Sequence, residues 1–299
     1  MTTSPVIHAM HTHPPRLAPT GYDKVRPLFQ SLDHHLAVSA ILENSAPAAV
    51  YVDDPARPAA AFTWTGYRYF LAGSPQQTEF NQQVGALLAG TIAPQALASG
   101  REMAELKTGS SEWEASIRNT ILPGHELIRG QRQYLRFAAL RHDWRKRLPS
   151  GFRLDFVTAD LLARTDLAHL DDLREELCSE RLSVEDFLAR SFGLVAINDQ
   201  DASLAGWCTS EYNSDNRCEV GIGVLEPYQR RGLATAMGSA FVEHALNCGV
   251  TQIGWHCWAR NLPSVATALA IGYEKVCDYT TLIVRFDATR GPSRPDVHG

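Results

Sequence analysis

The segment at residues 218–234 constrains the fold most, because it combines a strand, a tight turn and the beginning of a helix. In its first part Val220, Ile222 and Val224 alternate with Glu219 and two glycines, which is the period-two pattern of a strand. A proline then ends the strand. The apolar residues that follow recur at i, i+3, i+4, i+7 and i+8, which predicts a helix with one buried face. These residues are Leu233, Ala236, Met237, Ala240 and Phe241.

The turn between this strand and this helix predicts an anion-binding site. The first backbone N–H groups of a helix have no acceptor within the helix, and the helix dipole adds positive potential at the same end. Gly232 lets the backbone approach an anion without an intervening Cβ, and Arg230 and Arg231 add positive charge beside it. The segment therefore predicts a site for a pyrophosphate group.

Two common phosphate-binding motifs do not explain this turn. The P-loop is disfavoured because the chain has no Gly-x-x-x-x-Gly-Lys-Ser/Thr segment. The dinucleotide fingerprint also fails, because Gly221-Ile-Gly223 is followed by Val, Leu and Glu and lies inside the strand.

Composition and charge narrow the class of protein. The chain has 299 residues and a net charge of -5, which favours a soluble protein of one large or two ordinary domains over one that binds nucleic acid. No apolar run is long enough for a membrane span, and the N-terminus lacks the features of a signal peptide. The six cysteines form no Cys-x-x-Cys pair, so we expect reduced thiols, a cytoplasmic location and no metal.

Changes in composition and in hydrophobic periodicity along the chain predict four parts. They are a disordered leader at 1–22, an α+β N-terminal domain at 23–147, a second domain at 151–287 and a flexible tail at 288–299. In the leader, His8, His11 and His13 have a spacing that suits a metal, but a Pro-rich disordered segment is the favoured interpretation. We expect one helix from Val25 to about Asn44 and little strand between 126 and 145.

In the second domain, the pattern of apolar and turn residues predicts the order strand, helix, helix, hairpin, strand, turn, helix, strand, helix, strand. Its turn reads Gln229-Arg-Arg-Gly232-Leu-Ala234, and Asn261-Leu-Pro-Ser264 and Gly272-Tyr273 follow. Over residues 152–286 the chain resembles the GNAT N-acetyltransferases, whose signature is Q/R-x-x-G-x-G/A after an extended strand. The first half is similar to the leader domain of a GNAT subfamily typified by zwittermicin A resistance proteins. The similar segments are Leu32-Asp-His-His35, Tyr51-Val-Asp-Asp-Pro55 and Tyr69-Phe-Leu-Ala-Gly73.

The resemblance implies a mixed α/β sheet of the GNAT type, preceded by a smaller α+β domain, and acetyl-CoA as cosubstrate. Acetyl-CoA would enter where the signature strand and the strand at 251–258 part. Main-chain groups around 222–224 would pair with the pantetheine arm, and residues 230–235 would hold the pyrophosphate. The implied cofactor-binding residues are Ile222, Gly223, Val224, Gln229, Arg230, Arg231, Gly232, Leu233, Ala234, Thr235, Asn261 and Ser264.

Amine acetylation needs a base, because freeing an alkylammonium at pH 7 costs about 4.6 kcal/mol, from about 3.4 pKa units at about 1.36 kcal/mol each. Glu219 is the first candidate, since its neighbours on the same face, Gly221 and Gly223, would leave open space beside it. An edge carboxylate paired with a surface arginine is the alternative. The GNAT resemblance also implies that a strand bulge, common here in the family, would disturb the alternation that opens this space. His256 is the second candidate, with a buried, hydrogen-bonded strand histidine as its alternative.

The general acid departs from the family pattern. Many GNAT enzymes place a tyrosine on the helix after the asparagine, and Ala268 stands at that position here. The CoA thiolate would then leave unassisted or take a proton from water. Tyr279 or Tyr273 could substitute as the acid, but a core or hairpin position is the favoured interpretation of both. The resemblance implies an N-acetyltransferase that moves an acetyl group to a primary amine of a small molecule, such as an antibiotic or metabolite, by direct attack in a ternary complex. The alternatives are a catalytically weak CoA-binding regulatory or scaffold protein, and an acyltransferase that uses a longer acyl-CoA.

Overall fold

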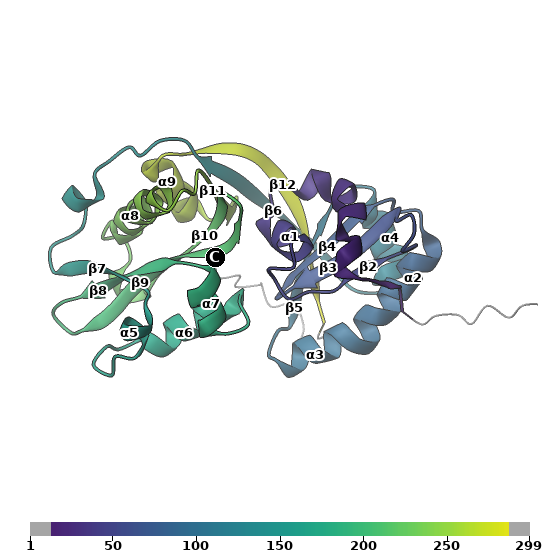
Figure 1. Cartoon of the computed structure of the whole chain (residues 1–299), viewed down its shortest axis with the longest axis horizontal. Coiled ribbons are helices and arrows are strands. Elements are labelled where there is room, and N and C mark those ends of the chain that lie inside the picture. The colour runs from purple at the N-terminus through teal and green to yellow at the C-terminus, as the bar shows by residue number, and fades with distance from the viewer. Residues whose placement is uncertain (1–12, 287–299) are drawn as a thin grey trace, which may run out of the picture. The chain divides into compact units, whose positions relative to one another are not determined.

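The computed structural model describes residues 13–286, which divide into two compact units (Figure 1). Unit 1 comprises residues 13–32, 48–128 and 282–286, and unit 2 comprises residues 33–47 and 129–281. This division differs from the predicted boundary at 148–151, because residues 33–47 and 129–150 cluster with the second half of the chain. The predicted tail and most of the predicted leader lie outside the described residues.

Unit 1 is a sheet with helices packed on it. Its strands, in sheet order, are β1 (Arg16–Leu17), β2 (Val50–Val52), β3 (Ala60–Thr65), β4 (Arg68–Gly73), β5 (Met103–Thr108) and the last residues of β12 (Tyr273–Arg285). β4 and β5 run parallel, and the other neighbours run antiparallel. The described end of the predicted leader is therefore ordered: β1 pairs with β2, and Tyr22 is buried.

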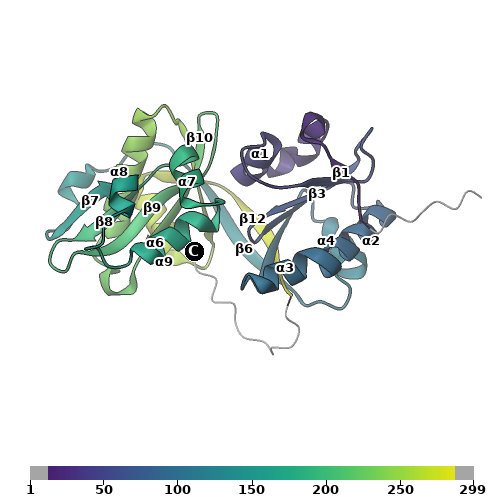
Figure 2. The same cartoon turned by 60° about the horizontal axis from the view of Figure 1, so that its bottom comes forward.

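Helices of unit 1 cover one face of this sheet (Figure 2). They are α2 (Thr78–Leu87), the π-helical turn Leu88–Ile92, α3 (Ala93–Ala98), α4 (Trp113–Ser116) and the π-helical turn Ile117–Ile121. Unit 1 also has 3₁₀ helices at Pro19–Lys24 and Arg26–Leu32, whose buried side chains are not part of the core beneath this face. The core joins Phe62 and Leu71 of the strands to Phe80 of α2 and Trp113 of α4. These side chains are all almost fully buried, so apolar burial holds the helices to the sheet.

Unit 2 contains the predicted signature segment. Its strands, in sheet order, are β7 (Phe152–Phe156), β8 (Gly193–Asn198), β9 (Ser203–Ser214), β10 (Arg217–Val224), β11 (Gln252–Trp258), β6 (Leu127–Phe137) and the first part of β12. β10 and β11 run parallel, and β7 to β10 form an antiparallel meander. The expectation of little strand at 126–145 is wrong, because β6 pairs antiparallel with β11.

Helices cover both faces of the unit 2 sheet, with α8 and α9 on one side and α5 to α7 on the other (Figure 1). They are α1 (Leu36–Leu42), α5 (Ala159–Leu162), α6 (Leu170–Ser179), α7 (Val184–Arg190), α8 (Leu233–Asn247) and α9 (Leu262–Ile271). Residues of β8 alternate between two cores: Leu194 and Ala196 pack with α8, and Val195 and Ile197 pack with α6 and α7.

The predicted single helix from Val25 to Asn44 is wrong. The chain forms 3₁₀ turns up to Leu32, and His35 then takes an extended backbone (φ -97°, ψ 98°) before α1 begins at Leu36. The leucine spacing that suggested one helix therefore spans a break. Within residues 13–286, no helix combines the length and apolar character that crossing a membrane requires.

Candidate active site

A pocket of about 430 Å³ opens in unit 2 where β10 ends and α8 begins. It is lined by every residue predicted to bind the cofactor except Gly223 and Arg231. Sequence reasoning missed other residues that line it. These are Tyr228, Trp255, Pro263 and Thr267. Trp255 could have been predicted from the sequence, because alternation along a strand places adjacent residues on opposite faces of the sheet, and Trp255 precedes His256 on β11.

The pocket lies where two parallel strands part. β10 pairs with β11 up to Val220 and Trp255, and β10 then continues to Val224 alongside β9. Ile222 and Val224, from this last part of β10, line the pocket. The backbone of β10 beyond Val220 therefore has one edge that its parallel neighbour does not cover.

The turn into α8 has a left-handed backbone at two positions. Gly232 is the N-cap of α8 (φ 84°, ψ 1°), and no atom lies within 4 Å of where its Cβ would be. Arg230 also has a positive φ of 60°. Glycine adopts this conformation without strain, whereas an L-residue does so at a cost. The turn thus leaves open space in front of the N–H groups that begin α8.

Two residues that were predicted to bind the cofactor, Arg231 and Gly223, do not line the pocket. The guanidinium of Arg231 donates a hydrogen bond to the carbonyl of Pro227 at 3.1 Å and lies over the ring of Tyr228. A Cβ on Gly223 would lie 3.1 Å from the indole nitrogen of Trp207. Arg231 is therefore held against its own turn, and the space beside Gly223 is filled by an aromatic ring.

Asn261 and Ser264 line the pocket and also shape the start of α9. The Asn261 side chain accepts a hydrogen bond from the backbone N–H of Ser264 at 3.2 Å, which is an N-cap contact. The Ser264 hydroxyl accepts a hydrogen bond from the indole N–H of Trp255 at 3.1 Å. This chain of contacts fixes one wall of the pocket.

Glu219 is buried rather than open, with only 1% of its surface exposed. The expected open glycine face beside it is wrong, because the β10–β9 register shifts between Cys218 and Val220 and neighbouring side chains fill the space. A Cβ on Gly221 would lie 2.7 Å from a carboxylate oxygen of Glu211. The Glu219 carboxylate instead accepts a hydrogen bond from the backbone N–H of Leu36, the first residue of α1.

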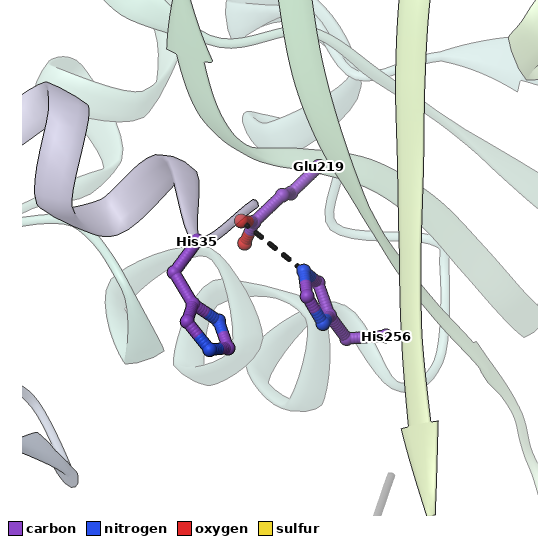
Figure 3. A group of neighbouring side chains, drawn as sticks. All are labelled: His35, Glu219 and His256. Carbon is purple, nitrogen blue, oxygen red and sulfur yellow. Dashed lines mark ion pairs between the residues drawn. The ribbon is translucent and has the colours of Figure 1, made fainter. Parts of the chain in front are cut away.

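Glu219 lies beside two histidines, as Figure 3 shows. His256 Nε2 is 3.5 Å from Glu219 Oε1 and 3.0 Å from the carbonyl oxygen of His34, and His256 Nδ1 is 2.9 Å from the Tyr279 hydroxyl. The ring of His35 stacks on that of His256 with centroids 5.0 Å apart. The structure thus brings the two predicted catalytic residues together and places His256 in a hydrogen-bonded, largely buried position.

The histidines before α1 were not predicted to take part in the site, and Tyr279 was weighed only as a substitute acid and not favoured. The His34-His35 pair lies in the first half of the chain, directly before α1, and the leucine spacing around it predicted an unbroken helix. Tyr279 comes from β12. None of these contacts has a sequence spacing that reveals it, because the partners are far apart along the chain.

The surroundings of the cluster are apolar and aromatic. The Tyr134 ring stacks on His256 with centroids 4.8 Å apart. Burial, and next the Glu219 carboxylate, raise the pKa of Tyr134 above its usual value. Tyr134 is therefore a neutral phenol near pH 7, and its ring contributes a low-polarity wall to the cluster.

The sequence model of the GNAT acetyltransferase family matches residues 26–282. The chain belongs to this family. The match spans both units, so the first half of the chain is part of the family pattern and not an addition to it. The mixed sheet with its parting parallel strands is the GNAT fold.

Known relatives agree with this assignment. An uncharacterized N-acetyltransferase of Bacillus subtilis (strain 168), YdfB, is 26% identical over 265 residues, which are 87% of this chain and 94% of YdfB. An N-acetyltransferase-like protein from Streptococcus suis has the same fold, with a TM-score of 0.66 and 20% identity over 89% of this chain and 99% of that one. A tandem GNAT protein from the clavulanic acid biosynthesis pathway superimposes with a TM-score of 0.57 at 14% identity, over 93% of this chain and 98% of that one.

Proposed function

We propose that this protein transfers an acetyl group from acetyl-CoA to the primary amine of a small molecule in a ternary complex. The observation that carries the proposal is the pocket at the end of β10, which joins an uncovered strand edge to a helix N-terminus through a left-handed turn at Gly232. Main-chain donors and acceptors on one side and positive charge on the other suit a pantetheine arm that ends in a pyrophosphate.

In this proposal the pyrophosphate binds in front of α8, beside Arg230 and Thr235, and the pantetheine arm runs along Ile222–Val224. One feature supports the order of these parts: the Gln229 side chain donates a hydrogen bond to the Val224 carbonyl at 3.0 Å and so links the turn to the strand edge. The thioester then lies where β10 and β11 part. Asn261 and Ser264 contact the cofactor from the opposite wall.

The reacting amine must lose a proton before or during its attack on the thioester carbonyl. Its nitrogen bonds to the carbonyl carbon, the oxyanion is held by a backbone N–H, and the C–S bond breaks to release the CoA thiolate. We assign the base to Glu219 and His256, whose polar atoms are 3.5 Å apart. Since Glu219 is fully buried, the amine proton reaches the pair at His256 or through a water molecule.

The thiolate finds no acid at the usual position. Ala268 is fully buried in the core beneath α9 and has no hydroxyl group. We propose that the thiolate takes its proton from water. The same observation favours the second candidate function, a CoA-binding regulatory or scaffold protein with little activity. A transferase for a longer acyl-CoA differs only in the room that the acyl group requires.

The acceptor is proposed as a small cationic amine, such as an antibiotic or a metabolite. The support is the similarity of three segments of the first half to zwittermicin A resistance proteins and the acidic balance of the chain, whose net charge is -5. The six cysteines are free, which agrees with a cytoplasmic protein that makes no disulfides.

Two measurements test the proposal. Calorimetry with acetyl-CoA should give one site per chain, and a thiol-release assay against a panel of small amines should identify an acceptor. Absence of acetyl-CoA binding would overturn the cofactor assignment. Binding without turnover on any amine would favour the regulatory alternative, and faster turnover with a longer acyl-CoA would favour the third candidate.

A further inference from the structure

The cluster of His35, Glu219 and His256 has a property that amine acetylation does not require. One potential ligand atom from each residue lies within 4.8 Å of the other two (Figure 3). The three residues come from separate segments of unit 2: the residue before α1, the beginning of β10 and the middle of β11. His35 is 2% exposed and Glu219 is 1% exposed, so the group is enclosed by protein.

Two imidazole nitrogens and one carboxylate oxygen form a ligand set that suits a divalent transition-metal ion. Bonds of about 2.0–2.1 Å in tetrahedral geometry place neighbouring ligand atoms roughly 3.4 Å apart. The separation of 3.5 Å between His256 Nε2 and Glu219 Oε1 already matches this value. The His35 nitrogen lies within 4.8 Å of both atoms, so its ring has to move toward them when an ion binds.

The contacts around the cluster resemble those that orient metal ligands. A histidine ligand usually hydrogen-bonds through its other ring nitrogen, and His256 Nδ1 is 2.9 Å from the Tyr279 hydroxyl. The backbone N–H of Leu36 donates a hydrogen bond to Glu219 Oε1, the same oxygen that lies 3.5 Å from His256 Nε2, and a carboxylate oxygen has a second lone pair left for an ion. Both ligands are therefore fixed by groups outside the cluster, which lowers the entropy lost on binding an ion.

We propose that His35, Glu219 and His256 bind one divalent transition-metal ion, for which zinc is the natural probe. The Glu219 carboxylate neutralises part of the charge of the ion. Three protein ligands leave the fourth tetrahedral position open for water. Binding at His256 Nε2 displaces the proton that this nitrogen donates to the His34 carbonyl, and the neutral ring then carries its proton on Nδ1, which donates to the Tyr279 oxygen. No net proton is released at this ring.

A consequence follows if the proposed function is correct, and it rests on that function. Glu219 and His256 cannot accept the proton of the amine while they bind a cation. Zinc should therefore inhibit acetyl transfer, while acetyl-CoA still binds in the pocket, because neither residue lines it. The metal site would act as an inhibitory switch on the base.

The direct test is metal binding to the full-length protein after chelator treatment. Calorimetry with ZnCl₂, and titration with CoCl₂ followed by visible absorption, should each give one equivalent. The separate variants His35→Asn, Glu219→Gln and His256→Asn should each weaken zinc binding at least tenfold. Tyr279→Phe should weaken zinc binding less, because it removes only a contact that orients a ligand.

Two controls separate this site from other histidines. The first replaces His8, His11 and His13 of the leader by alanine, and the expected result is one remaining equivalent of bound ion. The second is His169→Asn, which makes the same chemical change at an exposed residue with a left-handed backbone that asparagine tolerates. It should leave zinc binding unchanged.

Three results would overturn the proposal: no stoichiometric binding, binding that disappears with the leader histidines alone, or binding that survives all three cluster variants. Circular dichroism and acetyl-CoA calorimetry check that each variant folds, and with three independent variants one unfolded protein does not decide the outcome. Zinc binding without any turnover would count against the proposed function alone. Turnover without zinc binding would count against the metal site alone.

Discussion

The two units share one order of elements and differ in what lies at the end of the first strand. In unit 1 the order is β4, the helical run α2–α3, β5 and α4, and the strand that follows, β6, lies mostly in unit 2. In unit 2 it is β10, α8, β11, α9 and β12. In both units the first two strands of this series are parallel neighbours. The chain therefore repeats a strand–helix–strand–helix–strand pattern that its sequence did not reveal.

The connection from strand to helix is the first difference. In unit 1 residues 74–77 join β4 directly to α2, whose N-cap Gln77 has an ordinary negative φ of -77°. Its first turn carries the acidic residue Glu79. In unit 2 residues 225–232 make a longer turn with left-handed Arg230 and Gly232 and no acidic residue in the first turn of α8. A cavity of about 290 Å³ also adjoins the start of α2, but Asp53 and Glu79 line it, so of the two helix N-termini only that of α8 combines open space with positive charge for a diphosphate.

The pairing of the parallel strands is the second difference. β4 remains paired with β5 as far as Leu71 and Thr108, close to the end of both strands. β10 leaves β11 after Val220, well before it ends at Val224. The fold alone therefore does not create the cofactor site. A longer turn and an early parting of the strands create it, and unit 1 has neither.

The comparison is tested most severely by exchanging a buried carboxylate for an amide in each unit. Glu219→Gln in unit 2 should lower kcat by roughly 100-fold to 1,000-fold, because a proton acceptor in the reaction is lost. The amide keeps the size of the side chain. Steady-state kinetics across pH, with acetyl-CoA affinity from calorimetry, would check this. An unchanged kcat and pH profile would show that Glu219 is not part of the base.

The matched change in unit 1 is Glu105→Gln. Glu105 pairs with Lys107 at 2.8 Å, and both side chains are almost fully buried. Leaving Lys107 without its carboxylate should lower the free energy of unfolding by about 3 kcal/mol or more. The kcat per folded molecule should stay unchanged. A large fall in kcat with Glu105→Gln would mean that unit 1 contributes to the chemistry as well.

Alkaline pH tests a buried phenol of unit 1 next. Burial raises the pKa of Tyr69 in unit 1 to about 12, from an unfolded value of 10.0. Because the folded state favours the neutral phenol, stability should be complete below pH 10 and should fall between pH 10 and 12, by at most about 3 kcal/mol. Tyr69→Phe should remove this part of the pH dependence. Denaturant titrations at pH 9 and 11 would measure the free energy of unfolding of both proteins. An equal loss of that free energy between the two pH values in wild type and Tyr69→Phe would contradict the assignment.

The left-handed turn is tested by two equivalent glycines. Gly232 and Gly124 have φ values of 84° and 79°, and neither has an atom within 4 Å of the position that a Cβ would occupy. Substitution of either by valine should cost about 1–3 kcal/mol of stability through the same backbone strain. Gly232→Val alone should also weaken acetyl-CoA binding, by roughly 30-fold. Equal binding in the two variants would mean that the turn does not contact the cofactor.

Local patterns predicted the parts of unit 2 that depend on neighbours in the sequence. The alternation at Val220, Ile222 and Val224 and the spacing from Leu233 onward lie in β10 and α8 as expected. Apart from Trp255, the residues that line the pocket lie within 222–235 or within 261–267, where Asn261 caps a helix. Such features are set by backbone geometry within a few residues, so a sequence can display them.

The features that the sequence could not show depend on partners far away along the chain. The break before α1 places His35 beside Glu219, which lies in the other half of the sequence, and nothing in the leucine spacing at 25–44 signals it. β6 was missed because its burial pattern is irregular and its pairing with β11 supplies its stability. The family resemblance implied that a bulge could occur on this strand, but only the pairing of β10 with β9 places it at Cys218–Val220, where it changes the surroundings of Glu219.

The smallest expected effect separates two adjacent arginines. Arg230 lines the pocket, whereas the guanidinium of Arg231 donates to the Pro227 carbonyl. Arg230→Ala should weaken acetyl-CoA binding about tenfold, which corresponds to one exposed, charge-assisted contact of about 1.4 kcal/mol. Arg231→Ala should change affinity by less than about twofold. Calorimetry at 50 mM and 300 mM salt should show the difference shrinking, because an exposed charge is screened. A larger loss of acetyl-CoA affinity with Arg231→Ala than with Arg230→Ala would mean that the turn rearranges when the pyrophosphate binds. The early parting of β10 and β11, more than the charge of the turn, would then distinguish the two units.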